Sequence, residues 1–333
     1  MKTLWSALRD AGVLGINRRN IEFISAKNPR HYYPRVDDKM LTKKLCRDAN
    51  IPVPRLLASA EHTFALRQLV RILADQEDFV IKPARGAMGN GTLVVSRIEK
   101  SRAGLDFIVS GGKRLSEAEM LYHCSGVIAG LYSLGGQSDT VMVEERLRPH
   151  EELLAHCSDG VPDVRVIVYC GVPVMCMIRL PTLSSGGRAN LHQGAVGVGV
   201  AIDSGQTCHA VWKNRPITLH PDDGEPLLGW TIPDFERVLE IAVRAADQSG
   251  LGYVGADVVI DSRRGPVILE LNARPGLAIQ LANRAGLLPR LREIDVRMQG
   301  EAQALFESMK FSIRDRVSLG REITRGVQDR RQP

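Results

Sequence analysis

The sequence predicts an α+β protein with at least two lobes, each built on antiparallel strands. Two pairs of apolar segments carry this prediction. Residues 164–169 and 173–180 alternate around a Cys-Gly-Val turn, and residues 257–261 and 266–272 flank the turn residues Ser262 to Gly265. In addition, a glycine-rich loop joins two short apolar segments at 79–83 and 92–96. Helical periodicity occupies much of the chain between these strands.

The N-terminal half begins with a short helix near residues 2–11 and a Gly/Asn/Arg/Pro-rich segment that ends near residue 36, too small to be a domain. Helical periodicity from Asp38 to Asn50 predicts a helix with Asp37 or Asp38 as its N-cap. The Ile-Pro-Val-Pro run that follows ends this helix. The further elements expected in this half are a helix at 62–74, strands at 79–83 and 92–96, a hairpin at 97–114, a helix at 116–134 and a strand at 141–143.

In the C-terminal half, a polar glycine-rich loop at 181–195 follows the first hairpin, and a helix is predicted at 233–250. The tail after residue 300 begins with helical periodicity, and we expect it to lose order toward its end. The expected organisation is a short segment at 1–36, an N-terminal lobe at 37–147, a C-terminal lobe at 148–300 and a basic helix or tail at 301–333.

Composition is that of an ordinary globular chain of 333 residues, with 44% hydrophobic and 25% charged residues. Aromatic residues make up 5%, which argues against a base-stacking nucleic-acid surface. The six cysteines lack a CxxC pair, so reduced and buried thiols are expected. The N-terminus lacks the apolar stretch of a signal peptide, and no apolar run reaches membrane-spanning length. A cytoplasmic protein without a membrane partner is therefore the default expectation.

The net charge is +6, and the segment from Phe311 onward carries six arginines against three acidic residues. A moderate positive charge suits a pocket for phosphates and carboxylates, and it also suits weak nucleic-acid binding. Charge alone does not choose between these two interpretations.

The hairpin near the C-terminus carries the first candidate site. A four-residue loop at 262–265 would pair Asp261 with Pro266, Val259 with Ile268, and Asp257 with Glu270. Directly opposed side chains lie roughly 5 Å apart at Cβ, and like charges there are destabilising. Two facing carboxylates therefore call for a cation, and Asn272, on the same face as Glu270, adds a third oxygen ligand.

Oxygen ligation of this kind suits Mg²⁺ or Mn²⁺, and carboxylate-held magnesium is usually completed by phosphate oxygens. The hairpin thus predicts a nucleotide. We also expect replacement of Asp257 by alanine to leave the protein folded, because it removes a carboxylate repulsion.

The segment from Lys82 to Gly91 is the candidate phosphate cradle. Gly86, Gly89 and Gly91 allow backbone N–H groups to wrap phosphate oxygens, and Lys82 at the end of the preceding strand can reach the same oxygens. The pattern is neither a Walker loop nor a dinucleotide fingerprint, because no helix follows it. A flexible hairpin tip is the alternative interpretation.

Several charged residues near strand ends are weaker candidates. Glu145 and Arg146 follow an apolar strand, where a backbone hinge can hydrogen-bond an adenine edge. Asp163 and Arg165 begin a strand on one face, where a plain surface ion pair is an equal alternative, and Arg179 ends the next strand. The loop from Arg188 to Asn190 and His192 follows. Cationic side chains there could hold a transferring phosphoryl group or a substrate carboxylate. His192 by itself is more typical of a loop residue that forms a hydrogen bond than of a catalytic base.

Taken together and in order, these segments resemble the ATP-grasp superfamily, and within it the RimK-type α-L-glutamate ligases. The similarity extends over about residues 37–295 in five blocks. They are DDKMLTKKLCRDANIPVP, FVIKPARGAMGNGTLVV, VMVEERL, DVRVIVYCGVPVMCMIRL followed by RANLHQGA, and GYVGADVVI followed by VILELNARPGL. The resemblance implies an ATP-grasp fold, in which two lobes with antiparallel sheets clasp ATP.

The resemblance also implies roles for the residues. Lys39 and Lys82 would hold ATP phosphates beneath a flap of Gly86, Gly89 and Gly91. The remaining roles fall to residues of the later blocks: Glu145 and Arg146 at the adenine hinge; Asp163, Arg188 and Asn190 in the nucleotide site; Asp257, Glu270 and Asn272 as ligands of Mg²⁺ or Mn²⁺; Arg165 and Arg179 facing the reacting carboxylate.

The chain departs from the family pattern at its N-terminus. Only 36 residues precede the block at 37–54, whereas most ATP-grasp enzymes carry an N-terminal α/β domain of ~100 residues, the usual size of a domain. Two stretches look like insertions, at 97–140 and 203–232. In those enzymes the N-terminal domain helps to bind substrate, so the resemblance does not identify the acceptor substrate of this chain. The insertions, the tail or a second subunit could replace that domain.

Three functions follow from these patterns. The first is an ATP-dependent, ADP-forming carboxylate–amine ligase that acts through an acyl phosphate on glutamate or a related amino acid and a small acid or peptide. The second is a nucleotide-binding regulatory or scaffold protein of the same fold. The third, RNA binding, rests on the arginine-rich tail alone and is disfavoured by low aromatic content. A protein acceptor and assembly into a homo-oligomer are both compatible with the sequence. Every expected metal ligand and both lysines are present, which favours the enzyme over the regulatory or scaffold protein.

Overall fold

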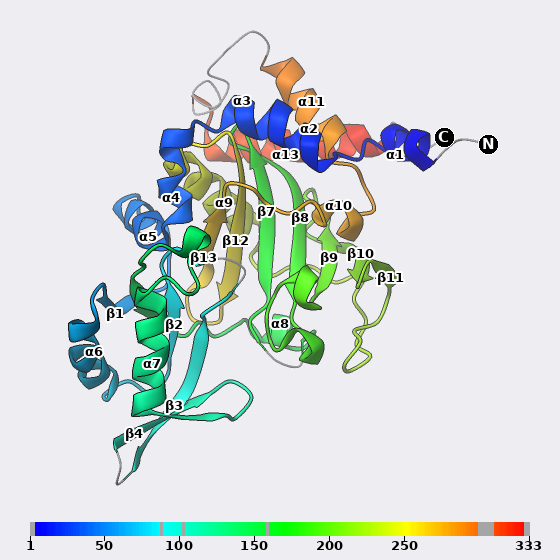
Figure 1. Ribbon diagram of the computed structural model, residues 1–333. Helices are drawn as coiled ribbons and strands as arrows, with labels where there is room; N and C mark the ends of the chain where they lie inside the picture. The colour runs from blue at the N-terminus through cyan, green and yellow to red at the C-terminus, as the bar shows by residue number, and fades with distance from the viewer. Residues whose placement is uncertain (1–3, 87–88, 102–103, 158–159, 299–309, 330–333) are drawn as a thin grey trace. The chain divides into compact units, whose positions relative to one another are not determined.

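The computed structural model describes residues 4–86, 89–101, 104–157, 160–298 and 310–329. The chain divides into two compact units, which we describe separately. The first unit contains residues 1–37, 41–53 and 148–333, and the second contains residues 38–40 and 54–147. Both are α+β structures with antiparallel sheets, as the sequence predicts (Figure 1).

The second unit is a six-stranded antiparallel sheet in the order β1-β6-β2-β3-β4-β5. Helices α6 and α7 contribute to its core, where alternate residues of the strands, such as Phe79, Ile81 and Val95, are buried. This alternation is the period-two pattern of a sheet with one covered face. Its elements are β1 (Leu56–Ala60), α6 (Leu66–Leu73), β2 (Phe79–Pro83), β3 (Leu93–Ser101), β4 (Gly104–Val109), β5 (Arg114–Ser116), α7 (Glu117–Ile128) and β6 (Val141–Glu144).

The predicted elements of this unit form close to the expected positions. Ser116 caps α7 through a capping box in which its side chain accepts from the N–H of Glu119 and the Glu119 carboxylate accepts from the N–H of Ser116. The helix expected at 62–74 is shorter, because a 3₁₀ turn (Thr63–Ala65) precedes it. The strand expected at 92–96 continues to Ser101, where it forms the predicted hairpin with β4.

The first unit is a seven-stranded antiparallel sheet in the order β11-β10-β9-β8-β7-β12-β13. Its four central strands are buried along most of their length, which explains their nearly continuous apolar sequences. The strands are β7 (Asp163–Tyr169), β8 (Val172–Leu180), β9 (Val196–Val200), β10 (Thr207–Trp212), β11 (Arg215–Ile217), β12 (Tyr253–Asp261) and β13 (Gly265–Asn272).

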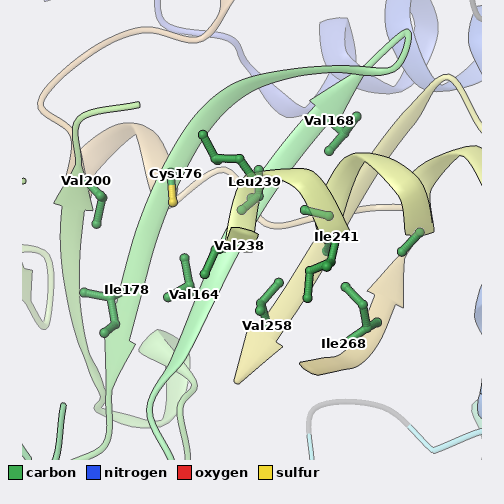
Figure 2. Close-up of a cluster of buried hydrophobic side chains, with 14 of the residues drawn as sticks. Val164, Val168, Cys176, Ile178, Val200, Val238, Leu239, Ile241, Val258 and Ile268 are labelled. Carbon is green, nitrogen blue, oxygen red and sulfur yellow. The ribbon is translucent and has the colours of Figure 1, made fainter. Parts of the chain in front are cut away.

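One face of this sheet is covered by α9 (Phe235–Ser249), which forms where a helix is expected at 233–250. Figure 2 shows Val238, Leu239 and Ile241 of this helix against the strand residues of the same core. The labelled strand residues are Val164, Val168, Cys176, Ile178, Val200, Val258 and Ile268.

The opposite face holds a second core made by the N-terminal segment and the C-terminal helices (Figure 1). Phe23 packs edge-on against Tyr169, with ring centroids 5.7 Å apart. The Asn28 side chain accepts from the Tyr253 N–H and donates to the Tyr253 carbonyl, both at 2.8 Å, as a neighbouring strand would. The segment before residue 37 is therefore part of this unit rather than a separate domain.

The helices outside the two sheets are short, apart from α13. They are α1 (Leu4–Asp10), α2 (Ile16–Arg18), a π-helical turn (Arg19–Ile24), α3 (Ser25–Lys27), α4 (Pro34–Asp37), α5 (Lys39–Asp48), α8 (Glu151–Leu154), α10 (Ile279–Ala282), α11 (Leu288–Arg297) and α13 (Ile313–Asp329). The Asp38 carboxylate accepts from the Met40 N–H at 2.9 Å, as its predicted N-cap role requires.

In the described part of the C-terminal tail, residues 310–329, the chain forms the packed helix α13. Residues 301–309 and 330–333, which include the end where a loss of order is expected, lie outside the described part. Three of the six arginines of the tail pair with acidic residues of the same unit. Arg316 forms a buried bidentate pair with Asp247 at 2.7 and 2.8 Å, Arg321 pairs with Glu236, and Arg325 lies 3.7 Å from Asp203. These three arginines therefore pair with acidic side chains within the first unit.

All six cysteines are free thiols, as expected, but Cys208 is exposed whereas the other five are buried. Among the described helices, none combines the length and the apolar character that crossing a membrane requires.

Replacement of Leu239 by alanine should lower the free energy of unfolding by about 2–5 kcal/mol, the usual cost of a cavity at a fully buried leucine. Trp212 and Trp230 pack against the same core, so their fluorescence in a urea titration reports the loss. Leu281→Ala is the control, because Leu281 is 50% exposed and should cost far less. Equal effects of the two substitutions would contradict this description of the core.

Candidate active site

Six of the predicted site residues lie together on one face of the first unit's sheet, opposite the face covered by α9. Strand register brings them together: Asp163 is opposite Arg179, Asp257 is opposite Arg165, and Asp257 is also opposite Glu270. Asn272 is two residues beyond Glu270 and shares its face. Four strands, β7, β8, β12 and β13, thus contribute to one polar cluster: Asp163, Arg165, Arg179, Asp257, Glu270 and Asn272.

The hairpin places Asp257 opposite Glu270, as predicted, but with a different turn length and strand register. The turn contains three residues, so Asp261 pairs with Gly265 and Val259 with Val267 instead of with Pro266 and Ile268. A β-bulge between Ile268 and Glu270 then restores the expected pairing. Gly265 has φ +73°, a conformation that glycine adopts without strain, which explains why the shorter turn closes here.

Asp257 is completely buried and is held by three side chains. Arg165 donates to both carboxylate oxygens at 2.7 and 2.6 Å, and Arg179 donates to Oδ2 at 2.8 Å. The Asn272 amide nitrogen donates to the same oxygen at 3.1 Å. Burial alone would raise the pKa of Asp257, but the two guanidinium groups hold it well below its usual range.

Arg179 also bonds Asp163, with both nitrogen–oxygen distances at 2.5 Å. Burial raises the pKa of Asp163 to about 6, because Arg179 is shared with Asp257 and offsets the cost of burial only in part. The cluster is therefore an alternating network of carboxylates and guanidinium groups. Such a network fixes the position of every member.

This geometry corrects the charge argument made from the sequence. The cation that neutralises Asp257 in the structure is the pair of arginines, so carboxylate repulsion does not by itself require a metal. Arg165 bonds Asp257, and Arg179 bonds both Asp163 and Asp257. The expected role of the two arginines toward a reacting carboxylate stays a prediction. The removal of Asp257 consequently leaves two arginines without a shared partner, rather than relieving a repulsion.

The donor set nevertheless suits a hard cation. Glu270 and Asn272 are half-buried, and the Asn272 amide lies 3.4 Å from the Glu270 carboxylate. Among the described residues, no group of three or more His, Cys, Asp or Glu has metal-binding geometry. The predicted metal ligands are two carboxylates and one amide oxygen, and oxygen ligands of this kind are those that magnesium prefers.

The loop that carries Arg188 and Asn190 begins directly after β8, two residues past Arg179. It contains two 3₁₀ turns, Leu183–Ser185 and Leu191–Gln193. The Asn190 side chain caps the second turn by accepting from the His192 N–H at 3.0 Å. Arg188 and His192 are exposed.

The second unit gathers the predicted lysines and the glycine loop. The Lys39 ammonium donates to the Gly86 carbonyl at 2.5 Å, and the Lys39 N–H donates to the Ala84 carbonyl at 3.0 Å. Lys82 is buried and pairs with buried Glu144 at 2.6 Å. Lys39 is thus next to the start of the glycine loop, whereas the ammonium of Lys82 bonds a carboxylate of the protein.

The glycine loop has partners that the sequence did not reveal. The His123 ring donates through Nε2 to the Gly91 carbonyl at 2.9 Å, and Tyr132 lies 3.4 Å from the other ring nitrogen. A Cβ on Gly91 would lie 2.6 Å from the Tyr132 ring, so only glycine fits there. His123 and Tyr132 belong to the predicted insertion at 97–140, where no sequence signal marked them.

Glu145 and Arg146, expected at an adenine hinge, already have contacts. The Glu145 carboxylate accepts from the Arg55 N–H at 2.6 Å, and the Glu145 N–H donates to the Arg55 carbonyl at 3.0 Å. Arg146 lies 3.8 Å from Asp78. Their role toward a nucleotide stays a prediction, as do the roles of Gly89 and the other candidates.

Comparison with known proteins identifies the fold family. A family model described as sugar-transfer associated ATP-grasp matches residues 18–296, which is most of the chain. The chain belongs to the sugar-transfer associated ATP-grasp family. The resemblance to the ATP-grasp superfamily is thereby confirmed, and the α+β fold with two antiparallel sheets is the fold of an ATP-grasp protein.

Individual proteins match this chain either over a short segment or at low sequence identity. A probable α-L-glutamate ligase of Xanthomonas axonopodis pv. citri (strain 306) is 52% identical over 42 residues, 13% of this chain and 14% of the relative. The ATP-grasp ligase PsnB with a minimal precursor is 19% identical, with 81% of this chain and 63% of that chain covered and a TM-score of 0.44. D-alanine–D-alanine ligase from Bacillus anthracis is 13% identical, with 86% and 69% covered and a TM-score of 0.40.

Asp257→Ala should lower the free energy of unfolding by about 3–5 kcal/mol, the usual cost of removing one partner from a buried ion pair. Glu270→Gln leaves Asp257 with both arginines, so it should change the free energy by less than about 1 kcal/mol. Urea titrations of the two variants measure the difference. An Asp257→Ala protein as stable as the parent would contradict the assigned network.

Burial lowers the pKa of His123, so the folded protein keeps this ring neutral below the pH at which an unfolded chain protonates it. The contribution of His123 to stability is therefore full above about pH 6.5, the ordinary pKa of histidine, and is lost as pH falls through the lowered value. His123→Gln keeps a donor toward Gly91 without titrating. As pH falls from 7.5 to 5.5, the free energy of unfolding should decrease more for the parent protein than for His123→Gln, as measured by urea unfolding at each pH. A difference between the two proteins that does not change with pH would contradict this prediction.

Proposed function

We propose that this chain is an ATP-dependent, ADP-forming carboxylate–amine ligase. The observation that carries the proposal is the convergence of Asp163, Arg165, Arg179, Asp257, Glu270 and Asn272, from four strands, on one sheet face. Membership of the ATP-grasp family supports it. The chain covers 14% of the curated relative and 63% of the PsnB chain, so the activity of neither protein is carried over whole.

In the proposed reaction, a carboxylate oxygen attacks the γ-phosphorus of ATP, the bond to ADP breaks, and an acyl phosphate forms. An amine then attacks the acyl carbon, the bond between that carbon and the phosphate oxygen breaks, and the proton lost by the amine nitrogen goes to the released phosphate or to water, so that the products are an amide and inorganic phosphate. Neither step needs a covalent nucleophile from the protein. The protein supplies positioning and positive charge where negative charge builds up.

Arg179 suits this role because it is already fixed. Asp163 holds two of its nitrogens, and one of these also bonds Asp257, so the guanidinium group is oriented before substrate arrives. Preorganised charge of this kind costs no rearrangement during the reaction. In the proposal, Arg165 and Arg179 attract the reacting carboxylate and phosphoryl group, while Asp163 and Asp257 keep both arginines in place.

Mg²⁺, or Mn²⁺, would be held by Glu270, Asn272 and Asp257. When bound, such an ion neutralises charge on the β- and γ-phosphates of ATP. Glu270 and Asn272 are half-buried and therefore more accessible than Asp257, whose oxygens are bonded to arginines. We assign the larger share of metal binding to these two residues.

The nucleotide itself would also use residues described with the second unit. Lys39 and Lys82, with the backbone at Gly86, Gly89 and Gly91, are the proposed phosphate ligands, and Glu145 and Arg146 are the proposed hinge at the adenine. Arg188 and Asn190, on the loop after β8, complete the proposed set. The cytoplasm, where ATP is available, stays the expected location.

The amino acid is proposed to be glutamate or a related one, on the basis of the short match to a probable α-L-glutamate ligase. For the carboxylic acid substrate, we propose a chemical class and not an individual compound. The PsnB structures contain precursor peptides, which supports a peptide, and the family description associates these proteins with sugar transfer, which supports an acid or amine carried on a sugar. The alternative proposal is a nucleotide-binding regulatory protein without ligation.

The test is release of ADP from Mg²⁺–ATP, screened over pairs of amino acids with free acids, peptides and sugar acids, with mass spectrometry of each product. Glu270→Gln should lower ADP release by about 100-fold, the scale of losing one charge-stabilising group. Glu240→Gln is the control, because Glu240 is exposed on α9 beyond the opposite face of the sheet. ATP binding without ADP release from any pair would favour the regulatory alternative, and full activity of Glu270→Gln would contradict the metal assignment.

A further inference from the structure

The loop between β8 and β9, residues 181–195, has hydrogen-bond partners both within itself and in other segments. It is rich in glycine and contains only two short 3₁₀ turns. Thr182 closes its base, because the Thr182 hydroxyl donates to the Gly194 carbonyl at 2.9 Å. The exposed residues between these ends include Arg188, a proposed ligand of the nucleotide.

One external contact comes from Trp212, the last residue of β10. Its indole N–H donates to the Gly194 carbonyl at 2.8 Å, the same oxygen that Thr182 bonds. Trp212 is half-buried and packs against the large core of the first unit. The indole ring is therefore a fixed donor at the C-terminal end of the loop.

A second external contact comes from Asp222, whose Oδ2 accepts from the Leu183 N–H at 2.7 Å. Asp222 belongs to a compact turn in which the His220 N–H donates to the Glu225 carbonyl at 2.8 Å and the Leu227 N–H donates to the Thr218 carbonyl at 3.0 Å. The Asp222 carboxylate is therefore held against the N-terminal end of the same loop.

Trp212 and Asp222 both lie in the stretch 203–232, which looks like an insertion in the family pattern. The two contacts are at opposite ends of the loop, and neither residue belongs to the charged cluster of Asp257. We infer that this insertion braces the loop that carries Arg188 and Asn190, with Trp212 and Asp222 as positioning residues for phosphoryl transfer. The inference rests on the proposed ligase function.

The consequence is a loop ordered before ATP binds. A misplacement of about 1 Å in a positioning element can cost roughly 100-fold in rate. Release of one brace should therefore lower the rate of the chemical step more than the affinity for ATP, because the other proposed phosphate ligands are not in this loop.

Trp212→Phe tests the indole contact, because it keeps a ring against the core and removes only the donor. We expect kcat for ADP release to fall about tenfold, with KM for ATP within about twofold, and amide hydrogen exchange in residues 183–194 to accelerate. Trp230→Phe is the matched control: Trp230 packs against the same core, and its indole N–H has no hydrogen-bond partner among the described residues. Identical kinetics and exchange in the two variants would overturn the inference.

Substitutions of Asp222 provide a second, independent test. Asp222→Asn keeps an oxygen acceptor for the Leu183 N–H, whereas Asp222→Ala removes it, so exchange in residues 183–194 should accelerate in the alanine variant and stay near the parent in the asparagine variant. Unchanged exchange in Asp222→Ala would overturn the role of Asp222. Exchange needs no turnover, so failure of the ligase proposal, seen as no ADP release from the parent protein, is distinguishable from failure of the brace.

Discussion

The first unit depends on one buried network of opposite charges. Asp257 and Asp163 lie in the interior of a sheet, where an isolated carboxylate would be very costly, and Arg165 and Arg179 neutralise them. The network requires β7, β8 and β12 in one register, because each charge belongs to a different strand from its partner. The apolar cores on the two faces fix this register. The same contacts orient two guanidinium groups and leave Glu270 and Asn272 more accessible.

In each unit, a loop proposed to bind the nucleotide is contacted by a stretch that looks like an insertion in the family pattern. In the second unit, His123 and Tyr132 contact Gly91 in the glycine loop. In the first unit, Trp212 and Asp222 contact the two ends of the loop after β8. Glycine-rich loops gain reach toward a ligand at the cost of their own order. Hydrogen bonds from neighbouring segments hold these loops without adding a side chain to the loops themselves.

The N-terminal and C-terminal segments have a structural role that composition does not suggest. Residues before 37 form part of the core with Tyr169 and Tyr253, and α13 packs on the same unit through Val317, Ile323 and Val327. The arginines of α13 bond Asp247 and Glu236. Part of the positive charge of the tail is thus used within the fold. A separate N-terminal domain is not what these residues form.

The sequence alone was enough to predict the two antiparallel sheets, most helices and strands, and a shared face for Asp257, Glu270 and Asn272, because period-two alternation and turn residues place them there. The sequence connected Asp163, Arg165 and Arg179 to a common site only through the family resemblance. It could not determine the turn length at Gly265 or the compensating bulge, since both depend on how β12 and β13 pack. Only the tertiary structure decided which charges pair. Arg165 and Arg179 are distant from Asp257 in sequence, and their bonding to it follows from strand order, which local patterns do not encode. His123, Trp212 and Asp222 carry no local signal for the same reason: their partners lie in other segments.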